Sequence, residues 1–185
     1  MMRIFPEITC VAMLLLTGRA AGAPAAAREK PVFDPVVFFT GRAHSTGVMK
    51  YVTGSSVKVE TSTVGRFHAG LLDLEQDLQF SDGKRQHRSW RIGRLDAHHF
   101  EATANDMVGS ARGEAHGNTF RWNFLLALSS GNPLTNVRLS QTMILQPDGR
   151  TVANETTITK LGLVVARVSE RFVRLTDQRG AGTRR

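Results

Sequence analysis

Residues 72–92 read LDLEQDLQFSDGKRQHRSWRI, and this stretch decides the fold class. In its first half, every second position is acidic or an amide. The positions between them form a mainly apolar series, which is Leu72, Leu74, Gln76, Leu78 and Phe80. Alternation with a period of two is typical of a β-strand that buries one face. Ser81-Asp82-Gly83 is a turn signal, and a second polar and apolar run follows it. The stretch therefore predicts a β-hairpin.

The loop length sets the register of this hairpin. A two-residue loop at Asp82-Gly83 would pair Leu74 with Arg91 and mix the two faces. A three-residue loop with Gly83 in the left-handed conformation keeps both faces consistent, and we predict it for that reason. It pairs Leu74 with Trp90, Leu72 with Ile92, Asp73 with Arg91, Asp77 with His87, and Gln76 with Arg88.

Arg88 falls on the apolar face in this register. A buried guanidinium is costly unless it is paired or hydrated. Arg88 could present a ligand-facing charge inside a barrel. Alternatively, it lies near a barrel mouth and its side chain reaches water. The residues favour the second interpretation slightly.

The same alternation recurs between Gly41 and Leu175, notably in residues 57–62, 120–128 and 137–145. Turn signals at 53–54, 116–118 and 147–149 separate the runs. About nine strands at this spacing predict an all-β barrel or sandwich in a single domain. Helix is expected only as a short turn at 33–39, with Asp34 as its N-cap and Pro35 at its first position.

The N-terminus predicts an export signal. Arg3 is followed by the short apolar run ITCVAMLLL at 8–16 and then by small residues up to Ala27. We therefore divide the chain into a signal peptide at 1–27, a barrel domain at 28–177 and a polar basic tail at 178–185, and expect a periplasmic or secreted protein. Cys10, the only cysteine, lies in the signal, so the mature domain would have no disulfide or thiol chemistry.

The chain is basic, with 24 Lys and Arg against 16 Asp and Glu and a net charge of +8. Export argues against nucleic acid as a partner. An anionic membrane surface or an acidic ligand fits that compartment better. A soluble, Arg-rich surface without a specific partner is the favoured interpretation of the charge alone.

Several segments resemble a proteobacterial family known as domain of unknown function 3833. The similar segments are residues 38–41, 74–83, 88–90, 105–113 and 117–118, with Asn154 and residues 160–162. The resemblance implies one antiparallel lipocalin-like (calycin-type) β-barrel of about 8–10 strands in an envelope compartment. It implies no established activity. Family members often stand beside genes for fatty-acyl modification, which suggests a lipid.

The residues offer no strong catalytic or metal motif. The six histidines have no metal-ligand spacing, and neither a nucleophile elbow nor a phosphate loop occurs. Asp73, Glu75 and Asp77 share a strand face and could suit a glycosidase pair, but a solvated charge ladder is favoured. Asp106 with Arg112 is a further polar candidate. We predict no metal and no cofactor.

A binding protein is therefore the leading hypothesis, with a filled core and a ligand pocket about equally compatible with the sequence. Apolar walls would bury the tail of a fatty acid or related lipid, and Arg88 would meet its acidic head. The alternatives are an envelope scaffold with a packed barrel, and a lipid-modifying enzyme that uses Asp106 or Glu75. The residues expected inside the barrel and against the ligand are Gln76, Arg88, Trp90, Asp106, Trp122 and Asn154.

Overall fold

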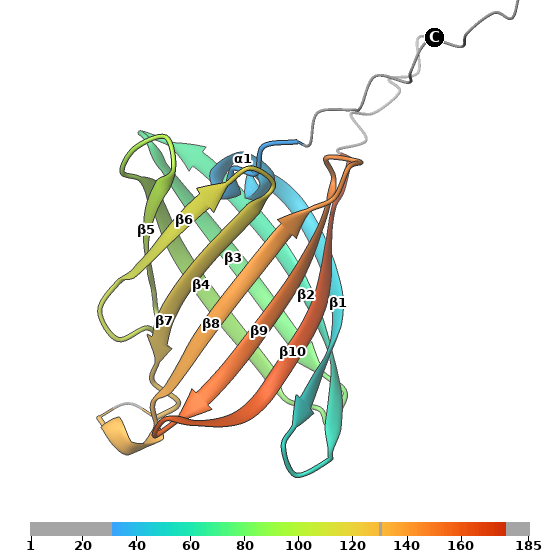
Figure 1. Ribbon diagram of the computed structural model, residues 1–185, viewed down its shortest axis with the longest axis vertical. Helices are drawn as coiled ribbons and strands as arrows, with labels where there is room; N and C mark the ends of the chain where they lie inside the picture. The colour runs from blue at the N-terminus through green and yellow to red at the C-terminus, as the bar shows by residue number, and fades with distance from the viewer. Residues whose placement is uncertain (1–30, 130, 177–185) are drawn as a thin grey trace, which may run out of the picture.

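The computed structural model describes residues 31–129 and 131–176, which form a closed antiparallel barrel of ten strands (Figure 1). The strands are β1 (Gly41–Tyr51), β2 (Ser56–His68), β3 (Leu71–Phe80), β4 (Arg85–Arg94), β5 (His99–Ala104), β6 (Ala111–His116), β7 (Thr119–Leu126), β8 (Val137–Leu145), β9 (Thr151–Lys160) and β10 (Leu163–Arg174). Each strand pairs with its neighbours in sequence, and β1 closes the barrel against β10. The predicted lipocalin-like all-β barrel is confirmed, with one strand more than the nine expected from the alternation.

The β3–β4 hairpin has the predicted register. Leu74 pairs with Trp90, and Gln76 pairs with Arg88. Gly83 has a φ of +87°, the left-handed conformation that a three-residue loop requires. Leu74 and Trp90 therefore point inward together with Gln76 and Arg88. The charged residues between them lie on the outer face, and these are Asp73, Glu75, Asp77 and Arg91.

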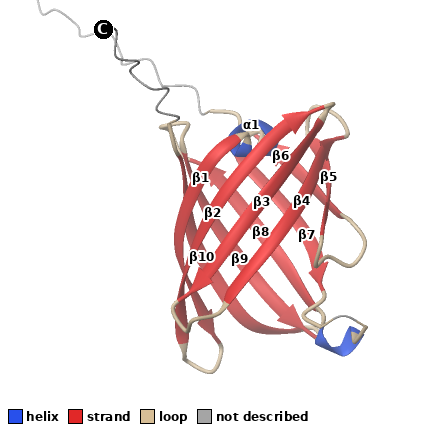
Figure 2. Cartoon of the chain, turned by 180° about the vertical axis from the view of Figure 1, so that it is seen from behind, coloured by secondary structure: helices blue, strands red, loops and turns tan. Residues whose placement is uncertain are grey.

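Short helix α1 (Pro35–Phe39) closes one end of the barrel (Figures 1 and 2). Asp34 is its N-cap, because its carboxylate accepts hydrogen bonds from the backbone N–H groups of Val36 and Val37, and Pro35 occupies the first turn as predicted. Phe38 and Phe39 are buried, so the helix acts as an apolar plug.

An aromatic cluster lies beneath this plug. Phe120 is fully buried and makes edge-on contacts with Phe33, Phe100 and Trp122, with ring centroids 6.1, 5.6 and 5.2 Å away. Such T-shaped pairs are a favoured aromatic arrangement. The interior of the barrel is therefore filled with aromatic side chains at the end next to α1.

Gly65 on β2 allows α1 to approach the barrel wall closely. A Cβ atom at this position would lie 2.0 Å from the carbonyl oxygen of Phe39 and 3.0 Å from Leu72 Cδ1. No side chain fits there without moving the plug or the strand. The glycine thus fixes how deep the plug sits.

The opposite end of the barrel is formed by the turns after β1, β3, β7 and β9 and by the 3-10 turn η1 (Pro133–Thr135), and we call it the open rim (Figure 1). Within the described residues, no helix is long and apolar enough to cross a membrane. The predicted signal peptide at 1–27 and the tail at 178–185 lie outside the described residues.

Candidate ligand-binding cavity

A cavity of about 400 Å³ lies inside the barrel between the aromatic cluster and the open rim. Pro35 and Phe39 of α1 form part of its floor, and Tyr51 and Leu128 line it toward the rim. Most of its walls are apolar side chains of the inward-facing strand positions. Its size lies within the range of about 300–1,000 Å³ that is usual for small-molecule sites. Of the two alternatives, a filled core and a ligand pocket, the structure therefore rules out an interior that is filled along its whole length.

Both tryptophans of the chain lie against this cavity. The rings of Trp90 and Trp122 are stacked, with centroids 5.1 Å apart and planes 18° apart. Trp90 Nε1 donates a hydrogen bond of 2.7 Å to Gln76, and Trp122 Nε1 donates one of 2.5 Å to Gln141. These two amides satisfy the only polar atoms of the indoles. The pair is thus a fixed apolar platform on one wall.

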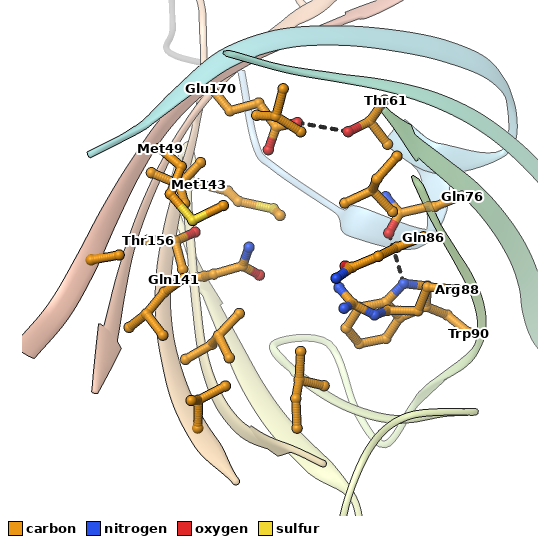
Figure 3. A pocket seen from close by; sticks show the side chains of 18 of the residues that line it. Met49, Thr61, Gln76, Gln86, Arg88, Trp90, Gln141, Met143, Thr156 and Glu170 are labelled. Carbon is orange, nitrogen blue, oxygen red and sulfur yellow. Dashed lines mark hydrogen bonds between the residues drawn. The ribbon is translucent and has the colours of Figure 1, made fainter. Parts of the chain in front are cut away.

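Arg88 enters the cavity from the wall beside this platform (Figure 3). Its side chain is only 11% exposed, so the interpretation that it reaches water at a barrel mouth was wrong. Its Nε lies 2.9 Å from both carboxylate oxygens of Asp106, and its Nη2 lies 2.8 Å from Oδ2. Its guanidinium carbon also lies 5.7 Å from the Trp90 ring centroid, within cation–π range. Asp106 therefore neutralises Arg88 at the cavity wall.

Glu170 lines the cavity from the facing part of the barrel wall, and sequence reasoning missed it (Figure 3). Its carboxylate accepts hydrogen bonds from the hydroxyls of Ser45 and Thr61, at 2.5 and 3.0 Å, and from Asn154 Nδ2 at 3.3 Å. The sequence does contain a pattern that could have identified this residue. Glu170 stands between Val168 and Phe172 in the inward-facing series of β10, as Gln76 stands among leucines in β3.

The structure places four of the six expected interior residues, Gln76, Arg88, Trp90 and Trp122, on the cavity lining. Asp106 lies in the turn after β5, where it holds Arg88, and Arg112 instead lies 3.7 Å from Glu101 on the outside. Asn154 is 1% exposed and reaches the cavity only through Glu170. The contact of all six with a ligand remains a prediction.

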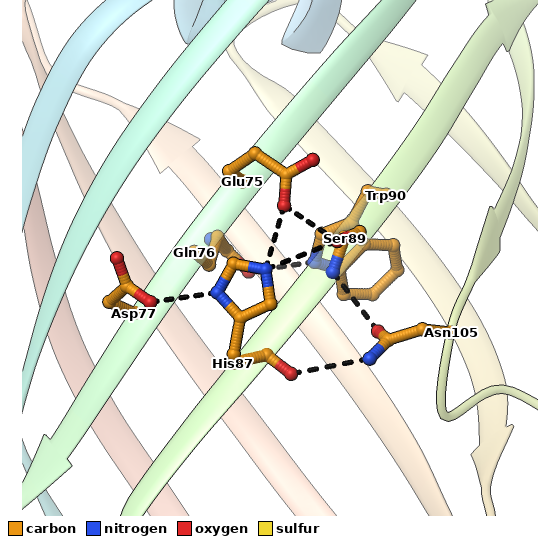
Figure 4. A network of polar contacts seen from close by, with 7 residues as sticks. All are labelled: Glu75, Gln76, Asp77, His87, Ser89, Trp90 and Asn105. Carbon is orange, nitrogen blue, oxygen red and sulfur yellow. Dashed lines mark hydrogen bonds and ion pairs between the residues drawn. The ribbon is translucent and has the colours of Figure 1, made fainter.

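Glu75, one of the acids considered for an enzyme, lies on the outer face of the barrel in a polar network (Figure 4). His87 Nδ1 lies 2.7 Å from Asp77, and His87 Nε2 lies 3.0 Å from Glu75 and 3.2 Å from Ser89 Oγ. This arrangement has the residue types of a catalytic triad, but Ser89 Oγ donates its proton to Glu75 at 2.6 Å. The Ser89 hydroxyl is therefore not directed at His87 as a triad would require, and the hydrogen bond that His87 donates to Asp77 raises the pKa of His87.

The network is instead the predicted charge ladder. Asp73 lies 3.3 Å from both His68 and Arg91, and Asp77 pairs with His87 as the register requires. Exposed pairs of this kind stabilise a fold only weakly. In the described part of the chain, no group of three or more His, Cys, Asp or Glu side chains could hold a metal ion.

One protein-family model matches most of the chain. The model of the family described as "Protein of unknown function (DUF3833)" matches residues 13–174. The chain belongs to this family. No curated protein matches the sequence.

Two solved structures share the fold. An S-type phycobiliprotein lyase, CPES, from Guillardia theta matches with a TM-score of 0.59 and 6% identity over 77% of this chain and 92% of that one. Rv2717c from M. tuberculosis matches with a TM-score of 0.55 and 14% identity over 77% of this chain and 99% of that one. At these identities the likeness concerns the barrel alone.

Proposed function

We propose that this protein binds a small, largely apolar ligand of the fatty-acid or lipid class inside its barrel, and that it does so as an exported protein of the cell envelope. The cavity carries the proposal, because apolar walls, a stacked indole pair and a few placed polar groups are the usual features of a small-molecule site. The likeness to a phycobiliprotein lyase concerns the barrel alone, so the proposal rests on the cavity and not on that protein.

A scaffold with a packed barrel accounts less well for the cavity. Protein interiors are normally close-packed, and a fold selected for rigidity alone gains stability when its core is filled. The packed aromatic cluster next to α1 meets that expectation, whereas the region toward the open rim does not. A binding role explains why the two halves of one barrel differ.

Native mass spectrometry of the mature protein, followed by organic extraction, tests the proposal directly. We expect a bound mass that extracts with an apolar solvent. Val168→Phe narrows the cavity and should lower the bound fraction, because Val168 lines it. Val173→Phe is the matched control, since Val173 is exposed on the outer face of the same strand. An unliganded protein that stays unliganded after incubation with envelope lipid extract would refute the proposal.

A further inference from the structure

Glu170 is a carboxylate that borders an apolar cavity without a cation. Its three hydrogen-bond donors, Ser45, Thr61 and Asn154, are all neutral. Within the described residues, no Lys, Arg or His nitrogen lies within 4 Å of it, since every ion pair found there involves other acids. A carboxylate in a poorly hydrated site is stabilised by further donors, and above all by a positive charge.

The wall around Glu170 is built to leave it room. Gly47 of β1 pairs with Glu170 across the sheet, and a Cβ atom at Gly47 would lie 2.9 Å from both Cα and Cβ of Glu170. Beside it, Oδ1 of Asn154 is buried without a hydrogen-bond donor in the described structure. The carboxylate and this amide oxygen can both accept from a ligand, while the hydroxyl of Thr63, two residues from Thr61 on β2, is the other buried polar side-chain atom without a partner in the described structure.

On the opposite wall, Arg88 offers a ligand of acidic type no uncompensated positive charge, although not all of its N–H groups are used by Asp106. Arg88 is held by both oxygens of Asp106, and Lys84, the other basic residue on the lining, pairs with Asp82 at 2.8 Å at the exposed rim. With Arg88 neutralised, Glu170 gives the inner cavity a net negative charge. A ligand carboxylate would meet repulsion there rather than attraction.

We propose, building on the function proposed above, that Glu170 receives the polar end of the ligand, and that this end is a hydrogen-bond donor, an ammonium or a hydroxyl, rather than a carboxylate. The ligand class is then an apolar chain or ring with an amine or alcohol group, which narrows the class proposed above to lipids other than fatty acids. This revises the role expected for Arg88, which serves as a wall for the ligand and not as the group that takes its head.

Three probes with the same chain, dodecylamine, dodecan-1-ol and dodecanoic acid, test this below their micelle concentrations. Binding changes the fluorescence of Trp90 and Trp122, which are the only tryptophans of the chain. We expect the amine to bind at least about tenfold more tightly than the acid at neutral pH, as a charge-assisted hydrogen bond implies. The alcohol should fall between them.

Glu170→Gln keeps an oxygen that can accept from Ser45 and Thr61, and it removes the charge. The variant should lose the preference for amine over acid, while Arg88→Gln should keep it. Tighter binding of the acid by the wild-type protein, or an unchanged order of affinities in Glu170→Gln, would overturn the inference while leaving an apolar site in place. Failure of all three probes to bind would instead overturn the proposed function and this inference together.

A separate observation concerns the open rim, where apolar side chains lie exposed. Leu161 is 78% exposed and Leu163 is 73% exposed, and the others are Val52, Leu128 and Leu134. Leu161 also has a φ of +50°, and Gly162 has one of +82°, in the two-residue turn between β9 and β10. Asparagine is the residue favoured at such a position, so a leucine there is costly both in conformation and in exposure.

Basic residues surround these apolar side chains. Those at or next to the rim are Lys50, Lys58, Lys84, Arg85, Arg138, Lys160 and Arg167. Of these, Lys84 alone forms an ion pair within the described residues, with Asp82. The only other acidic residue in the described turns at this end is Asp106, in the turn after β5, and it pairs with Arg88. Exposed leucines next to basic residues that mostly lack an acidic partner complement an anionic lipid surface.

We infer that the open rim docks on an anionic bilayer, with Leu161 and Leu163 inserting among the lipids. The docked face is then the end of the barrel through which a ligand reaches the cavity. This inference depends on the rim residues and not on the nature of the ligand.

Co-sedimentation with vesicles tests the docking. The mature protein should bind vesicles of phosphatidylcholine with phosphatidylglycerol, should bind pure phosphatidylcholine weakly, and should dissociate as salt rises, because salt screens surface charge. Leu161→Asn suits the left-handed turn, so it should keep or raise the melting temperature and yet lower vesicle binding several-fold. Val37→Asn, at an exposed position on α1, is the control and should bind normally. Equal binding by Leu161→Asn and wild type, or salt-independent binding, would refute the docking.

Discussion

Removing the charge of Asp106 should destabilise the barrel, and the same change at Asp82 should not. Two ion pairs of this chain have the same separation and different surroundings. Arg88 Nη2 lies 2.8 Å from Asp106, and Lys84 Nζ lies 2.8 Å from Asp82. The Arg88 side chain is 11% exposed, whereas that of Lys84 is 73% exposed. Burial is therefore the variable that separates the two pairs.

The magnitude follows from what each substitution leaves behind. Asp106→Asn leaves the guanidinium of Arg88 in the cavity wall without its counter-charge, and breaking a fully buried pair costs about 3–5 kcal/mol. The Asp106 side chain is itself 31% exposed, so water screens part of this cost, and we expect about 2 kcal/mol. For a domain of this size that is a fall in melting temperature of about 4–8 °C. Asp82→Asn leaves a hydrated lysine and should leave the melting temperature unchanged.

Thermal unfolding followed by circular dichroism measures both variants. A double variant, Arg88→Met with Asp106→Asn, removes the uncompensated charge and should be more stable than Asp106→Asn alone. Equal melting temperatures for Asp106→Asn and Asp82→Asn would contradict the argument, because they would show that Arg88 does not depend on Asp106. A double variant less stable than Asp106→Asn would contradict it as well.

Three further outcomes are expected. Gly65→Ala should displace α1 and lower the free energy of unfolding by about 1–3 kcal/mol or more, because the added Cβ would lie 2.0 Å from the Phe39 carbonyl oxygen. Hydrogen exchange over residues 33–40 should become faster, and unchanged exchange would refute the role of α1 as a plug. Phe120→Ala should cost about 3–5 kcal/mol in urea unfolding, since Phe120 is fully buried at the centre of the aromatic cluster, and a loss below 1 kcal/mol would mean that the cluster is not tightly packed. Because Asp77 raises the pKa of His87 above 6.5, wild type should be more stable than His87→Gln below about pH 6.5, and the difference should vanish as pH rises through the raised pKa; a difference that grows with pH would be the wrong sign.

The local rules of the sequence predicted local structure well. The turn at Ser81-Asp82-Gly83 determined the register of β3 and β4 because one glycine had to be left-handed for both strand faces to agree. The N-cap at Asp34 and Pro35 located α1 for a similar reason. The ten strands of the barrel lie at the upper end of the expected range of about 8–10. Among the strands, β5 and β6 are the least visible in a hydropathy pattern, because they are six residues long and several of their inward positions are Ala or Gly.

The partners of buried charges were not predictable in the same way, because they depend on closure of the barrel. Arg88 was correctly placed on an inner face, but its partner Asp106 lies in a turn beyond the next strand, and only the three-dimensional structure brings the two together. Glu170 is held by β1, β2 and β9, whose positions around β10 follow from pairing the first strand with the last.

The two charges also show why the sequence and the structure favour different head groups. An arginine on an apolar face suggests an acidic ligand, and the net charge of +8 suggests the same. Inside the barrel the balance is reversed, because Asp106 neutralises the arginine while Glu170 meets only neutral donors. Electrostatic attraction depends on local, unscreened charge and not on the total. The basic surface and the acidic cavity can thus serve different partners, an anionic bilayer at the open rim and a hydrogen-bond donor within.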